Sequence, residues 1–209
     1  AQTVVDITHT GTEVLELNTR GGDDVVAVQA NDISVHVNTG RGNDTINIGS
    51  TAAVDQVVVG TTGTLNAIDA LIDVNGFDLT DGAVILDRGS DTLNIEDRGA
   101  TSNDPGTARL ALLDRTMAEG RMVLTGLDLA TSGITYFGLE TINLSLGTGQ
   151  TDLVVDSTGF NDTTNILASS GQKDIAVYTI NGDTSILLGD GNDTVRVGDA
   201  NPASTDTLN

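Results

Sequence analysis

The sequence predicts an all-β fold, a right-handed parallel β-solenoid (β-roll or β-helix-like) with coils of about 20 residues. Three observations lead to this prediction. A Gly-Asp pattern recurs along the 209 residues, apolar and polar residues alternate directly after it, and no long apolar stripe of helical period competes with that alternation.

Six related stretches set the length of a coil. Each places Gly shortly before Asp, and Asp shortly before a segment rich in β-branched residues. The aspartates are 20, 47, 61, 22 and 19 residues apart, close to multiples of a period of roughly 20 residues. The stretches are RGGDDVVAV (20–28), GRGNDTINI (40–48), DRGSDTLNI (87–95), GTGQTDLVV (147–155), SGQKDIAV (170–177) and GDGNDTVRV (189–197), with Asp24, Asp44, Asp91, Asp152, Asp174 and Asp193.

Two short strands are expected in each coil. Residues 45–48, 92–95 and 194–197 alternate apolar and polar side chains, which is the period of a strand with one buried face. Residues 14–17 and 33–37 supply strands for the other half of a coil. Stacked coils would bury a ladder of Val, Ile and Leu between parallel sheets.

The pattern divides the chain into three parts. Solenoid coils are expected over residues 1–97 and, continuing the same stack, over residues 131–209. Residues 98–130 contain one proline, both methionines and four arginines, and are expected to form an irregular loop or insertion. A longer echo aligns residues 9–28 with residues 136–155, which favours a tandem-repeat protein.

The turns need glycine for a structural reason, because glycine adopts positive φ at little cost. That reason does not explain an aspartate fixed immediately before the strand. Stacking would place these carboxylates about 4.8 Å apart, and a column of like charges needs a positive partner. Since the chain has only 9 basic residues, the economical partner is Ca²⁺, which takes about six to eight oxygen ligands.

Two of the stretches resemble a known family. GRGNDTINI and GDGNDTVRV are similar to the glycine- and aspartate-rich nonapeptide of RTX (hemolysin-type) calcium-binding proteins. The resemblance implies a parallel β-roll in which Asp carboxylates and Gly carbonyls hold Ca²⁺ between successive turns, in proteins that are secreted unfolded and fold outside the cell. The matching positions are Gly40, Gly42, Asp44, Gly189, Gly191 and Asp193.

The partial repeats extend the expected set of calcium ligands to Gly22, Asp24, Gly89, Asp91, Gly149 and Asp152. One ion is expected between the first two coils, where it would bridge Asp24 and Asp44 and be surrounded by the carbonyls of Gly22, Gly40 and Gly42. Asn18 and Asn38 should stack as a polar ladder beside it.

The sequence also departs from the family pattern. It shows about one motif per coil where the family has two, so one edge of the stack is expected to bind metal and the other to be an ordinary turn. Residues 147–155 and 170–177 carry an extra residue between Gly and Asp. In the second of these, Lys173 stands beside Asp174, and its ammonium could replace calcium.

Composition limits the possible partners. The formal net charge of −21 disfavours nucleic acid and anionic membrane surfaces and attracts cations. There is no cysteine, and neither a signal peptide nor a membrane-spanning apolar run is evident. The chain is expected to be a piece of a longer protein, with any targeting signal outside it.

Catalytic chemistry is not expected. His9 and His36 are isolated, and no Ser-His-Asp order or phosphate loop occurs. Right-handed β-helices include polysaccharide lyases and epimerases, but aromatic residues are 2% of this chain, which leaves little to stack against sugar rings.

The leading expectation is a calcium-stabilised structural or adhesive module of a large extracellular repeat protein, such as an adhesin or a surface-fibre spacer. Its expected partners are calcium ions and neighbouring repeats or copies of itself, end to end. The alternative is an accessory RTX-type calcium-binding domain next to the catalytic domain of a secreted enzyme. An ice-binding face would need an outward array of threonines, and the turn residues form none.

Overall fold

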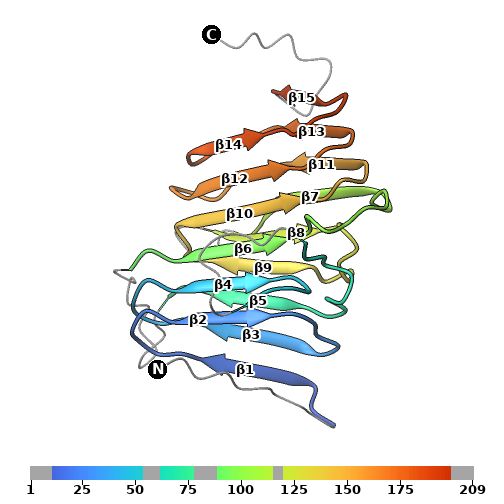
Figure 1. Cartoon of the computed structure of the whole chain (residues 1–209). Helices are drawn as coiled ribbons and strands as arrows, with labels where there is room; N and C mark the ends of the chain where they lie inside the picture. The colour runs from blue at the N-terminus through green and yellow to red at the C-terminus, as the bar shows by residue number, and fades with distance from the viewer. Residues whose placement is uncertain (1–10, 54–61, 78–88, 115–119, 199–209) are drawn as a thin grey trace.

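The computed structural model describes residues 11–53, 62–77, 89–114 and 120–198. In these residues the fold is all-β, without helices, and its strands lie in two sheets (Figure 1). His9 lies outside the described residues.

The nine-stranded sheet has the order β1 (Val14–Asn18), β3 (Ser34–Asn38), β5 (Ile72–Asn75), β9 (Ile134–Phe137), β8 (Arg121–Thr125), β7 (Thr107–Asp114), β11 (Thr151–Val155), β13 (Lys173–Val177), β15 (Thr194–Val197). The six-stranded sheet has the order β14 (Thr184–Leu187), β12 (Thr163–Ala168), β10 (Thr141–Leu146), β6 (Thr92–Glu96), β4 (Thr45–Ile48), β2 (Val25–Val28).

Successive strands alternate between the two sheets over most of the chain, so that the polypeptide climbs the stack coil by coil (Figure 1). Strand β1 pairs with β3, and β2 with β4, both in parallel. Asn18 lies beside Asn38, which is 20 residues later. The predicted all-β fold with parallel strands is therefore confirmed, and the arrangement is β-solenoid-like.

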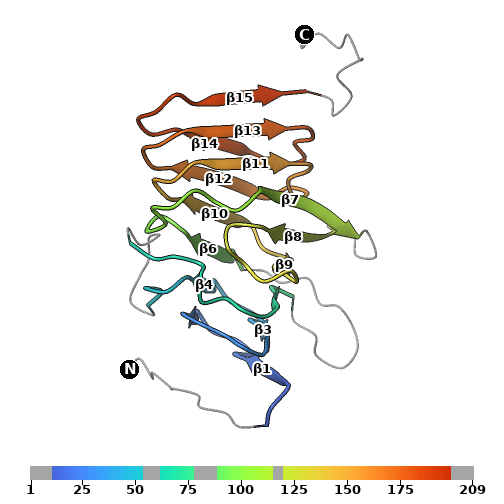
Figure 2. The ribbon, with the colours of Figure 1, turned by 90° about the vertical axis from the view of Figure 1, so that its right-hand side faces the viewer.

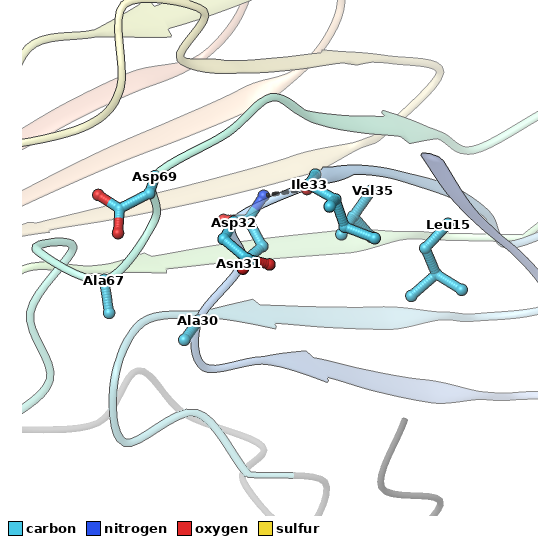
Figure 3. Close-up of a pocket in the computed structure, with 8 residues that line it drawn as sticks. All are labelled: Leu15, Ala30, Asn31, Asp32, Ile33, Val35, Ala67 and Asp69. Carbon is cyan, nitrogen blue, oxygen red and sulfur yellow. Dashed lines mark hydrogen bonds between the residues drawn. The ribbon is translucent and has the colours of Figure 1, made fainter. Parts of the chain in front are cut away.

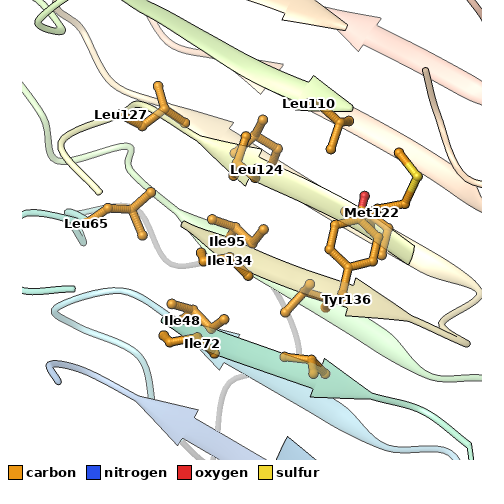
Figure 4. Packing of buried hydrophobic residues seen from close by; sticks show 14 of the residues in the cluster. Ile48, Leu65, Ile72, Ile95, Leu110, Met122, Leu124, Leu127, Ile134 and Tyr136 are labelled. Carbon is orange, nitrogen blue, oxygen red and sulfur yellow. The ribbon is translucent and has the colours of Figure 1, made fainter. Parts of the chain in front are cut away.

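The core lies between the sheets because alternate side chains of each strand point inward. Val37 and Val74 of one sheet and Ile46 and Leu93 of the other are completely buried. Figure 4 shows Ile and Leu side chains together with Met122 and Tyr136 stacked in this layer, one residue above another. Each coil can bury its apolar residues only against its neighbours, so the stability of the stack depends on coil-to-coil contact.

A three-strand meander interrupts the alternation. Strand β8 runs antiparallel to both β7 and β9, and the three strands lie between β5 and β11 in the nine-stranded sheet. Residues 98–130 were expected to be an irregular loop or insertion, but they contain β7 and β8, which join the sheet (Figure 2). Their alternating burial explains why: Leu110, Met122 and Leu124 enter the same core.

The turns line two opposite edges of the stack. We call the turns that lead from the nine-stranded to the six-stranded sheet the acidic edge, which carries Asp24, Asp44, Asp91 and Glu140, each placed directly before a strand. We call the turns that lead back the lysine edge; one of them ends at Lys173, the first residue of β13. A motif can lie on either edge, because each half of a coil is a strand followed by a turn.

This arrangement changes two sequence-based interpretations. The echo aligns β1 and β2 with β10 and β11, which traverse the sheets in the opposite order. It therefore relates opposite halves of a coil and is no evidence for a tandem repeat. The interval between Asp44 and Asp91 was interpreted as two periods, but Asp44 N donates to Asp91 Oδ1 across those 47 residues, so it is one coil with long connections.

Candidate functional site

The acidic edge is a ladder in which each carboxylate accepts a backbone hydrogen bond from the coil before it. Asp24 N donates to Asp44 Oδ1 (2.7 Å), and Asp44 N donates to Asp91 Oδ1 (2.8 Å). Asp91 N donates to Glu140 Oε2 (2.6 Å), and Thr39 Oγ1 donates to Asp91 Oδ2 (3.1 Å). Backbone N–H groups thus compensate part of the negative charge of the stacked carboxylates by donating hydrogen bonds to them.

The hydrogen bonds of Asp44 and Asp91 matter for stability because both side chains are buried. Asp44 and Asp91 are 1% and 0% exposed. A buried carboxylate is costly unless it is hydrogen-bonded or paired with a cation. The carboxylates of the acidic edge therefore depend on the hydrogen bonds that the neighbouring coils donate to them.

The glycines of these turns are required by close approach between coils as well as by their dihedral angles. Gly40 and Gly42 have φ of 89° and 138°. A Cβ at Gly40 would lie 2.0 Å from the carbonyl oxygen of Arg20, and one at Gly42 would lie 2.1 Å from that of Gly22. Only glycine allows adjacent turns to stack this closely, with or without a bound ion.

Two of the residues expected to bind calcium are neighbours on the acidic edge. Asp24 and Asp44 lie in successive coils, and Asp24 Oδ2 is buried without a hydrogen-bond partner. Asn38 Nδ2 donates to Asn18 Oδ1 (2.8 Å), which confirms the predicted ladder. Nowhere in the described residues do three His, Cys, Asp or Glu side chains form a group that could hold a metal ion. A calcium ion here would therefore depend on carbonyl oxygens and water as well as on the two carboxylates.

The structure separates the predicted ligands into two groups. One group lies on the acidic edge, and the other lies on the lysine edge, far from the first. The first group is Gly22, Asp24, Gly40, Gly42, Asp44, Gly89 and Asp91, and the second is Gly149, Asp152, Gly189, Gly191 and Asp193.

The register on the lysine edge explains the apparent extra residues. Thr151 pairs with Lys173, and Lys173 N donates to Asp193 Oδ1 (2.9 Å), so these three residues occupy equivalent positions where a turn meets the following strand. Asp152 pairs with Asp174 one residue further along, inside β11 and β13. The motif position therefore holds Thr, Lys and Asp in successive coils, and the assignment of Asp152 to that position was wrong.

Lys173 is fully buried, with 0% exposure. Its Nζ donates to the carbonyl oxygens of Gly149 (2.6 Å) and Ser170 (3.4 Å). Burial lowers the pKa of Lys173, while Asp193 and Asp104 act in the opposite direction. Thr151 Oγ1 also donates to Asp104 Oδ2 (2.6 Å), which brings Asp104 to the same edge.

Burial raises the pKa of two carboxyl groups beside the lysine edge, those of Asp97 and Asp104. Burial raises the pKa of Asp97 to about 7, against a hydrogen bond from Leu65 N and with added repulsion from Asp104 and Asp128. Burial likewise raises the pKa of Asp104. Asp97 Oδ2 and Asp104 Oδ1 are buried without hydrogen-bond partners.

His36 lies beside Asp73 in the nine-stranded sheet. Its Nδ1 is 3.6 Å from Asp73 Oδ2. The other oxygen of Asp73 accepts hydrogen bonds from Arg121 Nη1 (2.9 Å) and Thr135 Oγ1 (2.5 Å). Asp73 therefore serves mainly to join strands β5, β8 and β9.

A shallow pocket of about 280 Å³ lies where residues 67–69 approach β3 (Figure 3). Leu15 and Val35 form its apolar wall, and the exposed Asp32 and Asp69 lie at its rim. The side chain of Asn31 donates to the carbonyl oxygens of Ile33 (2.9 Å) and Ala70 (3.1 Å), so it holds two chain segments together. Among the residues that the structure describes, the lining contains two carboxylates and no Ser, Thr, Cys, His or Lys side chain.

Sequence reasoning missed two sets of interacting residues. Glu140 continues the acidic column, and its signal is the Gly-x-Glu of residues 138–140, directly before a strand. A second asparagine ladder crosses the six-stranded sheet, and its signal is the repeated Thr-x-Asn. Its members are Asn47, Asn94, Asn143 and Asn165, joined by side-chain hydrogen bonds of 2.8, 2.8 and 2.9 Å.

The chain matches no family model, and neither curated proteins nor solved structures match it. No helix long and apolar enough to span a bilayer occurs in the part of the chain that the structure describes. The features of this chain that bear on function are the stacked turns, the asparagine ladders and the nonapeptides GRGNDTINI and GDGNDTVRV.

Proposed function

We propose that this chain is a calcium-stabilised structural or adhesive module, a stiff right-handed solenoid spacer within a large extracellular repeat protein. The observation that carries the proposal is the column of stacked acids on the acidic edge, linked from Asp24 to Glu140. Right-handed winding is the usual hand of parallel crossover connections. Ladders on the edges and faces of the stack link each coil to the next, which suits the stack to act as a stiff spacer along its axis.

Calcium would act at the lower part of the acidic edge. Asp24 and Asp44 would supply carboxylate oxygens, and the carbonyls of Gly22, Gly40 and Gly42 would supply neutral ones. Ca²⁺ accepts such mixed oxygen ligands in irregular geometry. Its contribution would be to neutralise repulsion between the coils, so its binding would be coupled to their folding.

Calcium-dependent melting of two variants at Asp44 tests this proposal. Asp44→Asn retains a side-chain oxygen that can accept the hydrogen bond from Asp24 N, but it loses the charge. At a Kd of about 10⁻⁴–10⁻³ M, 10 mM Ca²⁺ should stabilise the wild type by roughly 1.4–2.7 kcal/mol per site. Asp44→Asn should lose most of this gain, and Asp44→Ala should lose the gain as well as some metal-free stability.

Asp69→Asn is the matched control, because it removes one exposed carboxylate from the connection between β4 and β5, away from the acidic edge. It should keep the calcium response of the wild type. A wild-type melting temperature that is the same in chelator and in calcium would overturn calcium stabilisation and leave the backbone N–H groups as the main partners of the column.

A further inference from the structure

The two edges of the stack use the same geometry with different charges. On the acidic edge, Asp24 N donates to Asp44 Oδ1 (2.7 Å), 20 residues later. On the lysine edge, Lys173 N donates to Asp193 Oδ1 (2.9 Å), also 20 residues later. Lys173 therefore occupies the turn position that Asp24 occupies on the other side. A pair of carboxylates on one edge corresponds to a lysine–carboxylate pair on the other.

The surroundings of Lys173 are those of a cation site. Its Nζ donates to the carbonyl oxygens of Gly149 and Ser170, and it is shielded completely from solvent. Asp193 and Asp104 provide negative charge within electrostatic reach of the ammonium. Two carbonyls and two carboxylates are the oxygen donors that a divalent cation would take. A protonated amine satisfies them because it has only donors to offer.

We propose that the Lys173 ammonium is a built-in cation of the lysine edge, held by the Gly149 and Ser170 carbonyls near Asp104 and Asp193, so that the coils from β11 to β15 stay folded without metal. Calcium dependence is then confined to the coils of the acidic edge between β1 and β6. Only this second statement depends on the proposed function.

The energetic reason is the cost of leaving buried acceptors without their donor. Removing the ammonium leaves the carbonyl oxygens of Gly149 and Ser170 unsatisfied in a buried site, and it removes the positive charge near the half-buried Asp193. Lys173 forms no hydrogen bond through its stem, so an apolar side chain of similar length preserves the packing and removes only the charge and its donors. Lys173→Met is therefore the informative change, and Gln172→Met, in the exposed neighbouring position of the same turn, is its control.

Peptide-resolved hydrogen exchange on the whole chain tests the inference. In chelator, the wild type should keep protection over residues 151–197 and lose it over residues 14–48. Lys173→Met should reduce protection over 151–197 by about five- to a hundredfold, with and without calcium, as expected when buried acceptors lose their donor. Gln172→Met should change nothing. Unchanged protection in Lys173→Met would overturn the proposal.

Two further variants keep the test decisive if Lys173→Met fails to fold. Adding Asp193→Asn should restore much of the lost protection, because it removes a carboxylate that the lysine compensates; a lysine that acts only by packing would give no such rescue. Lys173→Asp should make protection of 151–197 depend on calcium, as two stacked carboxylates then replace the mixed pair. If no segment of the wild type responds to calcium, the proposed calcium function fails, while the Lys173→Met and Asp193→Asn results still decide the role of the lysine.

Discussion

Asp97 makes the stability of this protein depend on pH in an unusual direction. It directly follows β6, its side chain is buried, and Oδ1 accepts a hydrogen bond from Leu65 N (3.1 Å). Burial raises its pKa from 3.8 to about 7. The folded state therefore binds a proton more tightly than the unfolded state, so this group favours folding fully below pH 3.8 and loses that contribution as the pH rises to about 7.

The size of the effect follows from the shift. At 1.36 kcal/mol per pKa unit, ionising Asp97 in the folded protein costs roughly 4 kcal/mol above neutral pH. Asp97→Asn cannot ionise and retains a side-chain oxygen for Leu65 N. It should match the wild type near pH 4 and exceed its stability by up to about 4 kcal/mol near pH 8, or on the order of 10 °C in Tm.

Urea unfolding across this pH range measures the difference directly. Asp69→Asn controls for the loss of one negative charge from an acidic chain, since Asp69 is exposed. The reasoning is refuted if the stabilities of the wild type and Asp97→Asn differ by the same amount at every pH, because a buried titrating carboxyl must produce a pH-dependent difference.

Two other variants probe the contacts between coils by thermal or urea unfolding. Gly42→Ala should lower the free energy of unfolding by several kcal/mol, because its Cβ would lie 2.1 Å from the Gly22 carbonyl oxygen. Gly22→Ala should lower it by only about 1–2 kcal/mol, for its positive φ, since nothing lies within 4 Å of a Cβ there. Equal losses of stability in the two variants would contradict the close-approach argument. Asn94→Ala should lower the free energy of unfolding by about 1–3 kcal/mol for each ladder partner left unsatisfied. Asn18→Ala, at the exposed end of the other ladder, should lower it less. A smaller loss of stability at Asn94 than at Asn18 would show that the ladder does not stabilise the stack.

Much of the fold could be predicted because the repeat is local. Alternation over residues 45–48 predicts a strand with one buried face; Ile46 and Ile48 are in the core as expected, while Asn47 on the other face is buried as well. The 20-residue interval between Asn18 and Asn38 predicts that they lie side by side, and they are hydrogen-bonded. Such features depend only on strand period and coil length, which the sequence displays directly.

The candidate site was only partly predictable, because a turn motif does not reveal on which edge it lies. GRGND and GDGND look alike, yet Asp44 lies on the acidic edge and Asp193 on the lysine edge. Each half of a coil has the same local structure, so the edge depends on the number of half-coils between the motifs. The β7–β9 meander alters that number through core contacts that no local pattern encodes.

The sequence by itself determined the all-β class, the parallel strands and the 20-residue interval of the first coils, and it predicted a positive partner beside the stacked acids. Only the tertiary structure decided which groups provide that partner. Backbone N–H groups face the carboxylates of Asp44 and Asp91, while the Lys173 ammonium lies near Asp193. The reason is physical: hydrogen bonding and burial depend on which atoms of the next coil lie within about 3 Å, and that is fixed by the register of the stack.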